Sequence, residues 1–424
     1  MKTLELNAAM ASATPPDWSG AVWVGNLDVA ALGDVESVRL RGSEGYTRAR
    51  FLVREGSAVR GFIELDAPDG LIGRAAIDQA ITALPRAAVR IDNAPLPSIT
   101  VVVCTRDRAS LLRAALTAIL SLDYADFNVV VVDNASRTSE THNLVEAEFT
   151  GPSVTLVTEP IPGLSYARNT GLHAATGEIV CFTDDDVIVD PDWLTELAAG
   201  FARVPNVDCV TGLVPSGELR TRTQGYFDGR VSWSRNLEFR TYSLAHPPPD
   251  LPMFPFSIGE FGTGANFALR RAAALELGGF DTALGVGTRT GGGEDIDMFT
   301  RVILDGRILV MQPSAIVWHR NRDDLPALRV QARGYGTGLG AWITKLLLNP
   351  RTARMVLVRS PHALKRLISL ARRKPAAFEA VTATERDEWD REISRVGWLE
   401  LFSVARGPLS YALQRRSGES TTRR

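Results

Sequence analysis

The chain has 424 residues, of which 45% are hydrophobic and 23% are charged, and its formal net charge at pH 7 is −2. Because domains usually run to about 100–200 residues, this length predicts two or three folded units, and the hydrophobic content excludes a largely disordered chain. The near-neutral net charge argues against a protein dedicated to binding nucleic acid, whose charge would be strongly positive.

The three cysteines, Cys104, Cys181 and Cys209, lie in or beside apolar runs. Their odd number argues against a disulfide framework and favours buried thiols in a reducing compartment. Residues 1–20 have no uninterrupted apolar segment of the kind that a signal peptide needs. No run approaches the roughly 18 apolar residues of a transmembrane helix. We therefore expect a cytoplasmic protein.

Residues 1–96 predict a small, mainly β N-terminal domain. Short apolar runs between turn residues indicate strands at Ala21–Val24, Val38–Leu40, Ala49–Val53 and Val59–Leu65. A short helix is expected over Ile72–Leu84, and two prolines in residues 93–97 indicate a linker. No residue of this domain suggests a particular chemistry.

Residues 97–323 predict an α/β domain. Ser98–Cys104 is a nearly continuous β-branched run, which is typical of a strand buried on both faces. An amphipathic helical pattern follows over residues 111–120, and further strands are expected at Asn128–Val132 and Val154–Thr158. This β-α-β-α-β order predicts a doubly wound, Rossmann-like sheet. In such sheets ligands bind beyond the carboxyl ends of the strands.

Three consecutive carboxylates, Asp184, Asp185 and Asp186, follow the apolar strand expected at Ile179–Thr183. Like charges in adjacent positions repel one another, and burying an unpaired carboxylate is costly, so a divalent cation would stabilise the group. Alternation along an extended segment directs Asp184 and Asp186 to one side, and Mg²⁺ and Mn²⁺ favour such oxygen ligands. The alternative is a solvated acidic turn that caps the next helix.

A glycine-rich run, Gly291–Gly293, leads into Glu294, Asp295 and an apolar helical pattern. One interpretation makes one of these acids a general base. The other is ordinary acidic capping, which the helix dipole favours. No Gly-Lys-Ser/Thr sequence follows, so the run is not a P-loop.

Two single residues are further candidates. His319, after the apolar run Ala315–Val317, could supply an imidazole ligand to a nearby cation, or could be a structural histidine at a strand end. Arg168, in a helical segment that follows Gly163, could bind a phosphate, or could be a surface arginine.

Residues 324–414 predict a helical, basic C-terminal region, and residues 415–424 a disordered polar tail. Residues 325–378 contain no Asp or Glu, and their lysines and arginines alternate with apolar residues. This pattern suits peripheral contact with an anionic membrane surface, on the inner face of the cell membrane; the alternative is a helical subdomain with solvated charges. No nucleic-acid-binding module accompanies the charge, so no nucleic-acid partner is expected.

The order of the motifs between Ser98 and Arg320 resembles that of the family 2 glycosyltransferases. The matching segments, in chain order, are VVVCTRDR, VVVDNAS, GLSYARNTGLHAATGEIVCFTDDDV, FGTGANFALRR, GGFD, GGGEDIDM and VWHR. The resemblance implies the GT-A fold, an α/β fold with a doubly wound mixed sheet, flanked here by the β-rich N-terminal domain and the helical C-terminal region.

The resemblance also implies a site for the sugar donor. Thr105, Arg106 and Asp133 match positions that hold the base and ribose of the nucleotide, and Arg168 falls near the diphosphate.

The metal site is implied by the DxD motif at Asp184, Asp185 and Asp186. Asp184 and Asp185 are assigned to the nucleotide sugar, and Asp186, with Asp184 and His319, to a Mn²⁺ or Mg²⁺ ion.

On the acceptor side, Asp295 matches the catalytic base, with Glu294 beside it. Gly264, Ala265 and Asn266 match a stretch that shapes the pocket for donor sugar and acceptor.

These roles predict an inverting glycosyltransferase of cell-envelope polysaccharide biosynthesis. It would move a sugar from a nucleotide-diphosphate sugar to a hydroxyl of a saccharide or lipid-linked acceptor. The alternatives are a metal-dependent nucleotidyltransferase and a non-catalytic saccharide- or lipid-binding protein of the same fold. The sequence does not identify the sugar, nucleotide, acceptor or oligomeric state.

Overall fold

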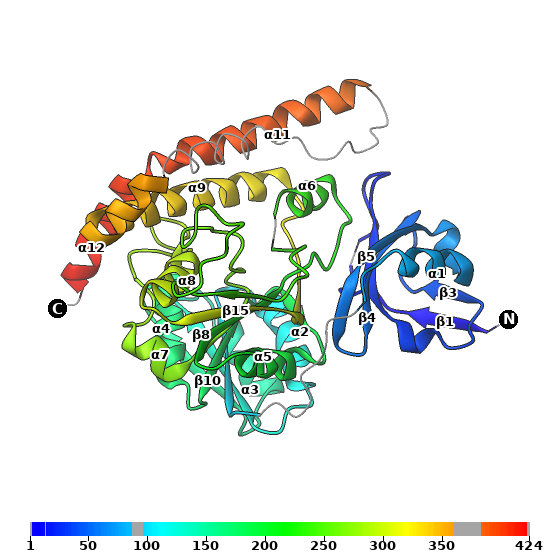
Figure 1. The fold of residues 1–424 in the computed structure, drawn as a ribbon, viewed down its shortest axis with the longest axis horizontal. Coiled ribbons are helices and arrows are strands. Elements are labelled where there is room, and N and C mark those ends of the chain that lie inside the picture. The colour runs from blue at the N-terminus through cyan, green and yellow to red at the C-terminus, as the bar shows by residue number, and fades with distance from the viewer. Residues whose placement is uncertain (1, 13, 87–95, 232, 360–382, 422–424) are drawn as a thin grey trace.

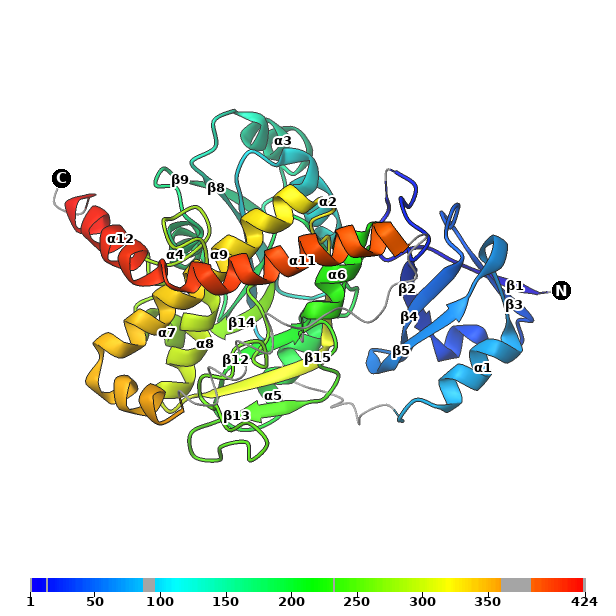
Figure 2. The same ribbon diagram turned by 90° about the horizontal axis from the view of Figure 1, so that it is seen from above.

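The computed structural model describes residues 2–12, 14–86, 96–231, 233–359 and 383–421 (Figure 1). A β-rich unit at the N-terminal end lies beside a larger α/β unit, and long C-terminal helices run along one side of the α/β unit. Seen from above, α11 lies along α9 and reaches over α6 (Figure 2). The predicted α/β fold with a β-rich N-terminal part and a helical C-terminal part is confirmed.

The N-terminal unit has two three-stranded sheets, ordered β1-β3-β6 and β2-β4-β5. Its elements are β1 (Thr3–Leu6), β2 (Trp23–Asp28), β3 (Ser37–Leu40), β4 (Arg48–Glu55), β5 (Ala58–Asp66), β6 (Leu71–Gly73) and the helix α1 (Arg74–Thr82), with short 3₁₀ turns at Val29–Leu32 and Pro68–Gly70. Trp23, Phe51 and Ile63 are buried together between these elements and form a core separate from that of the α/β unit.

The central unit is a nine-stranded mixed sheet ordered β11-β15-β12-β14-β10-β7-β8-β9, with β13 paired to β15. The strands are β7 (Ile99–Thr105), β8 (Phe127–Asn134), β9 (Val154–Glu159), β10 (Ile179–Thr183), β11 (Val187–Val189), β12 (Val207–Leu213), β13 (Arg240–Tyr242), β14 (Asn266–Arg270) and β15 (Ile308–His319). The helices are α2 (Ala109–Leu120), α3 (Glu140–Glu148), α4 (Leu164–Ala174), α5 (Trp193–Ala202), α6 (Arg222–Arg230), α7 (Arg271–Glu276) and α8 (Glu294–Leu304).

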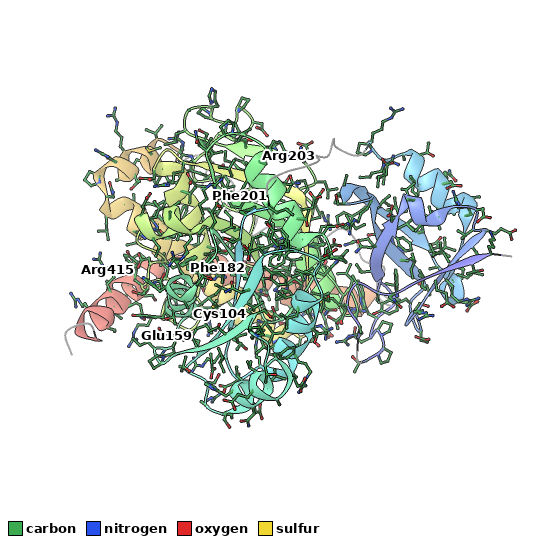
Figure 3. The ribbon with its side chains drawn as sticks, turned by 90° about the horizontal axis from the view of Figure 1, so that it is seen from below. Cys104, Glu159, Phe182, Phe201, Arg203 and Arg415 are labelled. Atoms are coloured by element: carbon green, nitrogen blue, oxygen red, sulfur yellow. The ribbon has the colours of Figure 1, made fainter. Side chains whose placement is uncertain are left out.

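Helices cover both faces of this sheet, which explains its uninterrupted apolar strands. Along β7, Val102 packs into one hydrophobic cluster while Val101 and Val103 pack into another on the opposite face. Phe182, in β10, lies inside the unit (Figure 3), stacked on Phe267 with ring centroids 4.9 Å apart. The sheet therefore has two cores, one on each face.

The four strands β10, β7, β8 and β9 are parallel, and their register sets the position of the site. Thr183 pairs with Val103, and Thr105 pairs with Asp133. The polar residues that follow these strands therefore meet at one edge of the sheet, where an α/β fold binds its ligands.

All three cysteines are free, as expected. Burial raises the pKa of Cys104 to about 12 and the pKa of Cys181 well above its usual value. Protonated thiols in these positions act as small apolar side chains.

The C-terminal region consists of α9 (Leu325–Leu348), a helical segment at 350–359, α11 (Ala383–Val404) and α12 (Gly407–Thr421). None of the described helices is both long and apolar enough to cross a membrane. Residues 360–378 of the basic stretch lie outside the described residues, and the membrane contact predicted for that stretch stays a prediction. The disordered tail predicted from residue 415 is wrong as far as Thr421, because those residues continue α12.

Candidate active site

The first part of the site is a cluster of Asp184, Asp186 and His319, whose potential ligand atoms all lie within 4.8 Å of one another. His319 Nε2 is 3.3 Å from Asp186 Oδ1 and 3.9 Å from Asp184 Oδ2. The antiparallel pairing of β11 with β15 sets Val187 opposite His319. The sheet thus brings together residues more than a hundred positions apart in sequence.

The side chains of this cluster change one another's pKa values. Burial and the neighbouring Asp186 raise the pKa of Asp184 to about 6. For Asp186, burial acts in the same direction, but His319 and Arg108 outweigh it and lower the pKa below its usual range. For His319, burial lowers the pKa, but the pull of Asp186 is stronger and raises it.

The donor set fits a divalent cation. Two carboxylates and an imidazole are ligands that Mn²⁺ accepts. His319 Nδ1 is 3.2 Å from Asn321 Oδ1, and an Nδ1–H donor there leaves the Nε2 lone pair directed at the two aspartates. Burial and the repulsion from Asp186 both raise the pKa of Asp184, and a bound cation would oppose both effects by stabilising the charged carboxylate.

Asp185 is turned away from this cluster, as the alternation of an extended chain requires. Its carboxylate accepts hydrogen bonds from Thr105 Oγ1 and Arg108 Nη1, both at 2.8 Å. Arg108 also lies 3.2 Å from Asp186 Oδ2. The side chains of Thr105 and Asp185 are therefore already paired with each other at the predicted nucleotide site.

The remaining donor-side residues lie along the same edge. The buried Asp133 accepts a hydrogen bond from Ser136 and lies 3.2 Å from His142 Nε2. Arg106 is exposed, and no hydrogen bond or ion pair holds its side chain within the described part of the chain. Both residues are close in sequence to paired strand ends, so a nucleotide at this edge would be within their reach.

Arg168 is buried and links the two halves of the site. Its Nη1 donates to Glu294 Oε1 at 3.1 Å, its Nη2 donates to the Gly264 carbonyl at 2.9 Å, and Asp184 Oδ1 lies 3.7 Å away. Its guanidinium also stacks over Phe267 at 5.4 Å. Sequence reasoning placed this arginine near the diphosphate. In the structure its hydrogen bonds run to the loop and helix that carry the second part of the site.

That second part is the start of α8. Asp295 Oδ2 accepts a hydrogen bond from the Gly264 backbone N–H, and Oδ1 accepts one from the Ile296 N–H, both at 2.8 Å. Glu294 is 5% exposed, and its Oε2 has no hydrogen-bond partner in the part of the chain that the structure describes. Burial and the adjacent Asp295 raise the pKa of Glu294 to about 7, against the opposing effect of Arg168.

The glycines before α8 have a structural reason. Gly293 has φ of 94°, and a Cβ there would lie 2.9 Å from the Gly338 carbonyl oxygen. Gly291 likewise lies backbone to backbone against Gly334. The run is therefore needed so that this loop can lie directly on α9.

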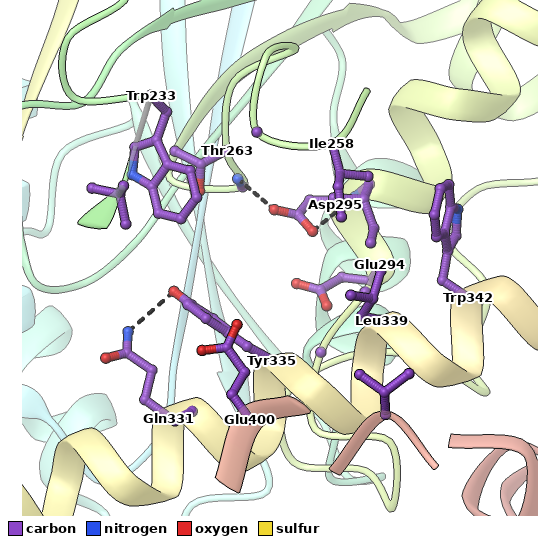
Figure 4. A pocket seen from close by; sticks show the side chains of 18 of the residues that line it. Trp233, Ile258, Thr263, Glu294, Asp295, Gln331, Tyr335, Leu339, Trp342 and Glu400 are labelled. Carbon is purple, nitrogen blue, oxygen red and sulfur yellow. Dashed lines mark hydrogen bonds between the residues drawn. The ribbon is translucent and has the colours of Figure 1, made fainter. Parts of the chain in front are cut away.

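One cavity of about 630 Å³ joins the two parts, and both Asp184 and Asp295 line it. Figure 4 shows Asp295 and Glu294 on one side and Tyr335 and Gln331 on the other. One member of the metal cluster, Asp184, thus shares this cavity with the predicted base, Asp295.

Gly264 and Ala265, predicted to shape this pocket, line the cavity. Asn266 is not among its lining residues. Its amide group donates to the carbonyls of Leu213 and Ala315, and its Oδ1 accepts from Trp193 Nε1. Its side chain therefore holds strands together and does not reach the pocket.

Sequence reasoning missed three residues of the site. Arg108 pairs with Asp185 and Asp186, and Arg322 lies 3.6 Å from Asp186 Oδ2. Tyr335, from α9, faces the cavity. Arg108 is three residues from Thr105, and Arg322 is three residues from His319, so the sequence could have indicated that both arginines lie near the site. The position of α9 over the site could not be predicted in this way.

The structure is thus a mixed α/β sheet with carboxylates and a histidine at one edge that could hold a cation. Residues 100–277 match the model of "Glycosyl transferase family 2", so this part of the chain is similar to that family.

Two curated relatives are similar over the same region. The "Pre-mycofactocin glycosyltransferase" of Mycobacterium tuberculosis (strain ATCC 25618 / H37Rv) is 30% identical over 234 residues, which cover 54% of this chain and 43% of that protein. The "Succinoglycan biosynthesis protein ExoM" of Rhizobium meliloti (strain 1021) is 29% identical over 276 residues, covering 63% of this chain and 78% of that protein. The match thus spans less than half the length of the first relative.

Among solved structures, the chain is similar to the mannosyltransferase PcManGT from Pyrobaculum calidifontis, in complex with GDP-Man and Mn²⁺. The sequence identity is 24%, the match covers 75% of this chain and 89% of that chain, and the TM-score is 0.49.

Proposed function

We propose that this protein is a glycosyltransferase that moves a sugar from a nucleotide-diphosphate sugar to an acceptor hydroxyl with inversion. The observation that carries the proposal is the single cavity lined by both Asp184, a member of the metal cluster, and Asp295. The match of residues 100–277 to the family 2 model supports the reaction class.

In this mechanism Asp184, Asp186 and His319 would hold a Mn²⁺ or Mg²⁺ ion. The ion supplies charge neutralisation for the nucleoside diphosphate as it departs. A donor held at this edge would lie beside the cavity that Asp184 lines. A leaving group bound on the metal side leaves the opposite face of the sugar open to attack.

Asp295 is the general base. Two backbone N–H groups fix its carboxylate, one on each oxygen, and the remaining lone pairs can accept the proton of an acceptor hydroxyl. The hydroxyl oxygen forms a bond to the anomeric carbon as the bond from that carbon to the diphosphate oxygen breaks. One displacement from the face opposite the leaving group inverts the anomeric configuration.

Arg168 and Glu294 are positioning residues. Arg168 bonds to the Gly264 carbonyl, and the N–H of the same residue bonds to Asp295. The arginine therefore fixes the loop that orients the base. Glu294 in turn offsets the buried positive charge of Arg168.

The test is a panel of nucleotide sugars with Mn²⁺ or Mg²⁺, scored by release of nucleoside diphosphate. Chelation by EDTA should abolish release. Asp295→Asn should lower kcat by about 10²- to 10⁴-fold, the usual contribution of a general base, while donor binding persists. Asp305→Asn, at the other end of α8 and half exposed, is the matched control and should keep full activity.

Three outcomes would contradict the proposal or a part of it. Release of pyrophosphate would indicate a nucleotidyltransferase. Binding of a donor without turnover, with any acceptor and either metal, would indicate a binding protein. Full activity of Asp295→Asn would remove this residue as the base.

A further inference from the structure

Much of the wall of the cavity is apolar. Helices α6, α9 and α11 converge there, and large side chains line it, including Phe227, Trp233, Phe256, Leu339, Trp342 and Leu346. Several of them are labelled in Figure 4, where Trp233 and Trp342 stand at opposite ends of the view and Leu339 lies between. A sugar ring would find few hydrogen-bonding partners along this wall.

Several polar groups of this wall are paired with one another, whereas Gln331 Oε1 and Trp342 Nε1 are buried and have no partner among the described residues. Arg230 Nη2 donates to Glu400 Oε2 at 2.6 Å, and Gln331 Nε2 donates to Tyr335 Oη at 3.1 Å. Because these groups hydrogen-bond to one another, they offer few free donors and acceptors to a saccharide in the cavity. Glu294 Oε2, a further buried acceptor without a partner among the described residues, lies beside Asp295. The cavity therefore has one polar end and one apolar end.

The apolar end continues to the surface. Leu347 lines the cavity and is 44% exposed, and Leu357 lines it and is 64% exposed. Next to them, Leu348 and Val358 are 65% and 71% exposed and do not line it. A cavity that opens between exposed leucines suits a ligand whose apolar part extends beyond the cavity itself.

We propose that the acceptor is an amphiphile: a polar head that carries the reacting hydroxyl, joined to an apolar tail. The head lies at Asp295, and the tail lies along α9 and leaves between Leu347 and Leu357. That the amphiphile is the acceptor rests on the proposed function. That an amphiphile binds here rests on the cavity alone.

Binding to the full chain can be measured without any donor. The probes are methyl, octyl and dodecyl β-D-glucoside, each below its micelle concentration, titrated by calorimetry. Each methylene that enters the cavity should tighten Kd by up to about fourfold. A phenyl-terminated glucoside forms a separate arm: tight binding of that probe alone identifies an aromatic tail, and tight binding of the alkyl series identifies an aliphatic one.

Two adjacent leucines give a matched pair of variants. Leu347→Gln should weaken dodecyl glucoside binding by about threefold to tenfold, since half of an apolar side chain is lost from the wall. Leu348→Gln makes the same change at an exposed position outside the cavity and should bind as the unsubstituted chain does. Both positions are on the surface, so both variants should fold, and thermal melting checks this.

The inference is overturned if the three alkyl glucosides and the phenyl probe bind equally weakly, or if the two variants cannot be told apart. These results are independent of the nucleotide assay. Release of nucleoside diphosphate to short sugars without any dependence on tail length would leave the proposed function standing and remove the amphiphilic acceptor. Binding that depends on tail length, without turnover of any nucleotide sugar, would support the amphiphile site and remove the proposed function.

Discussion

At the scale of single residues, the site is a set of buried charges that stabilise one another. Arg168 is the central member, because it contacts Glu294 and lies near Asp184, and its bond to Gly264 reaches the loop that holds Asp295. A buried charge of this kind persists only when its partners are also in place. Sequence reasoning identified these acids and this arginine, but not that Arg168 pairs with acids on both the metal side and the base side.

Glu294 makes this network sensitive to pH. Burial raises its folded-state pKa to about 7, above its ordinary value of 4.5. Between these values the folded state holds a proton that the unfolded state has lost, so the free energy of unfolding falls as pH rises from about 4.5 to 7 and is level above that. The loss is at most about 3 kcal/mol, because one pKa unit corresponds to about 1.4 kcal/mol.

Replacing Glu294 by Gln removes the titration. The variant lacks a partner for Arg168 and should be less stable at pH 8, but the decrease of its unfolding free energy between pH 5 and 7 should be smaller than in the unsubstituted chain. Urea unfolding at several pH values measures this difference. Glu146→Gln, on the exposed face of α3, is the control with the same change of charge. Identical pH profiles for Glu294→Gln and the unsubstituted chain would contradict the assignment.

At the scale of elements, α9 is held in place by glycines. Its sequence Gly334-Tyr335-Gly336-Thr337-Gly338-Leu339-Gly340 alternates small and larger residues. Gly334 and Gly338 meet the loop before α8, while Gly336 and Gly340 meet α11 and the residues that follow it. The side chains between them, Tyr335 and Leu339, line the cavity. This run therefore positions one wall of the site.

Adding a single methyl group to α9 at Gly340 should push α9 and α11 apart. A Cβ at Gly340 would lie 2.0 Å from the carbonyl oxygen of Val404, which is backbone and cannot move aside alone. Gly340→Ala should therefore destabilise the protein by about 1–3 kcal/mol, the usual cost of overpacking, and weaken amphiphile binding as α11 moves. Thermal melting and calorimetry measure the two effects.

The same substitution elsewhere is the control. Gly229, in α6, has no atom within 4 Å of its would-be Cβ, so Gly229→Ala should be neutral or stabilise the helix by up to about 1 kcal/mol. If both variants melted alike, close packing of α9 on α11 would not be the role of the glycine run.

The contrast between strands and helices shows what the sequence could predict. Strands such as β7 and β10 were predicted within one residue, because β-branched runs and the polar residues after them mark both a buried strand and its carboxyl end. The glycines of α9 lower helix propensity when read locally, and their purpose depends on segments up to seventy residues away. The role of Asn266 was hidden for the same reason, since its partners come from two other strands.

At the scale of the whole molecule, the N-terminal unit is attached close to the metal cluster. Arg54, in β4, pairs with the fully buried Asp190 at 2.5 Å and with Asp192 at 2.7 Å. Asp190 directly follows β11, the strand that begins immediately after Asp186. Arg50, on the same strand as Arg54, pairs with Asp228 at 2.7 Å. The N-terminal unit thus supports the strand that presents the metal ligands.

Breaking this contact should therefore weaken metal binding from a distance. Arg54→Met leaves Asp190 buried without its partner, a change that costs about 3–5 kcal/mol when a buried ion pair loses one member. We expect β11 to shift, the melting temperature to fall, and Mn²⁺ affinity measured by calorimetry to drop severalfold. Arg54→Met/Asp190→Asn removes the orphaned charge as well and should recover part of both losses.

Arg48→Met makes the same change on the same strand, where the arginine is half exposed and pairs with Glu64 inside the N-terminal unit. An exposed pair of this kind contributes little to stability, so this variant should bind Mn²⁺ as the unsubstituted chain does. Equal Mn²⁺ affinity in Arg54→Met and Arg48→Met would mean that the N-terminal unit is attached beside the site without supporting it. A loss confined to Arg54→Met, with recovery in the double variant, would show that the first ninety or so residues help to hold the metal ligands in position.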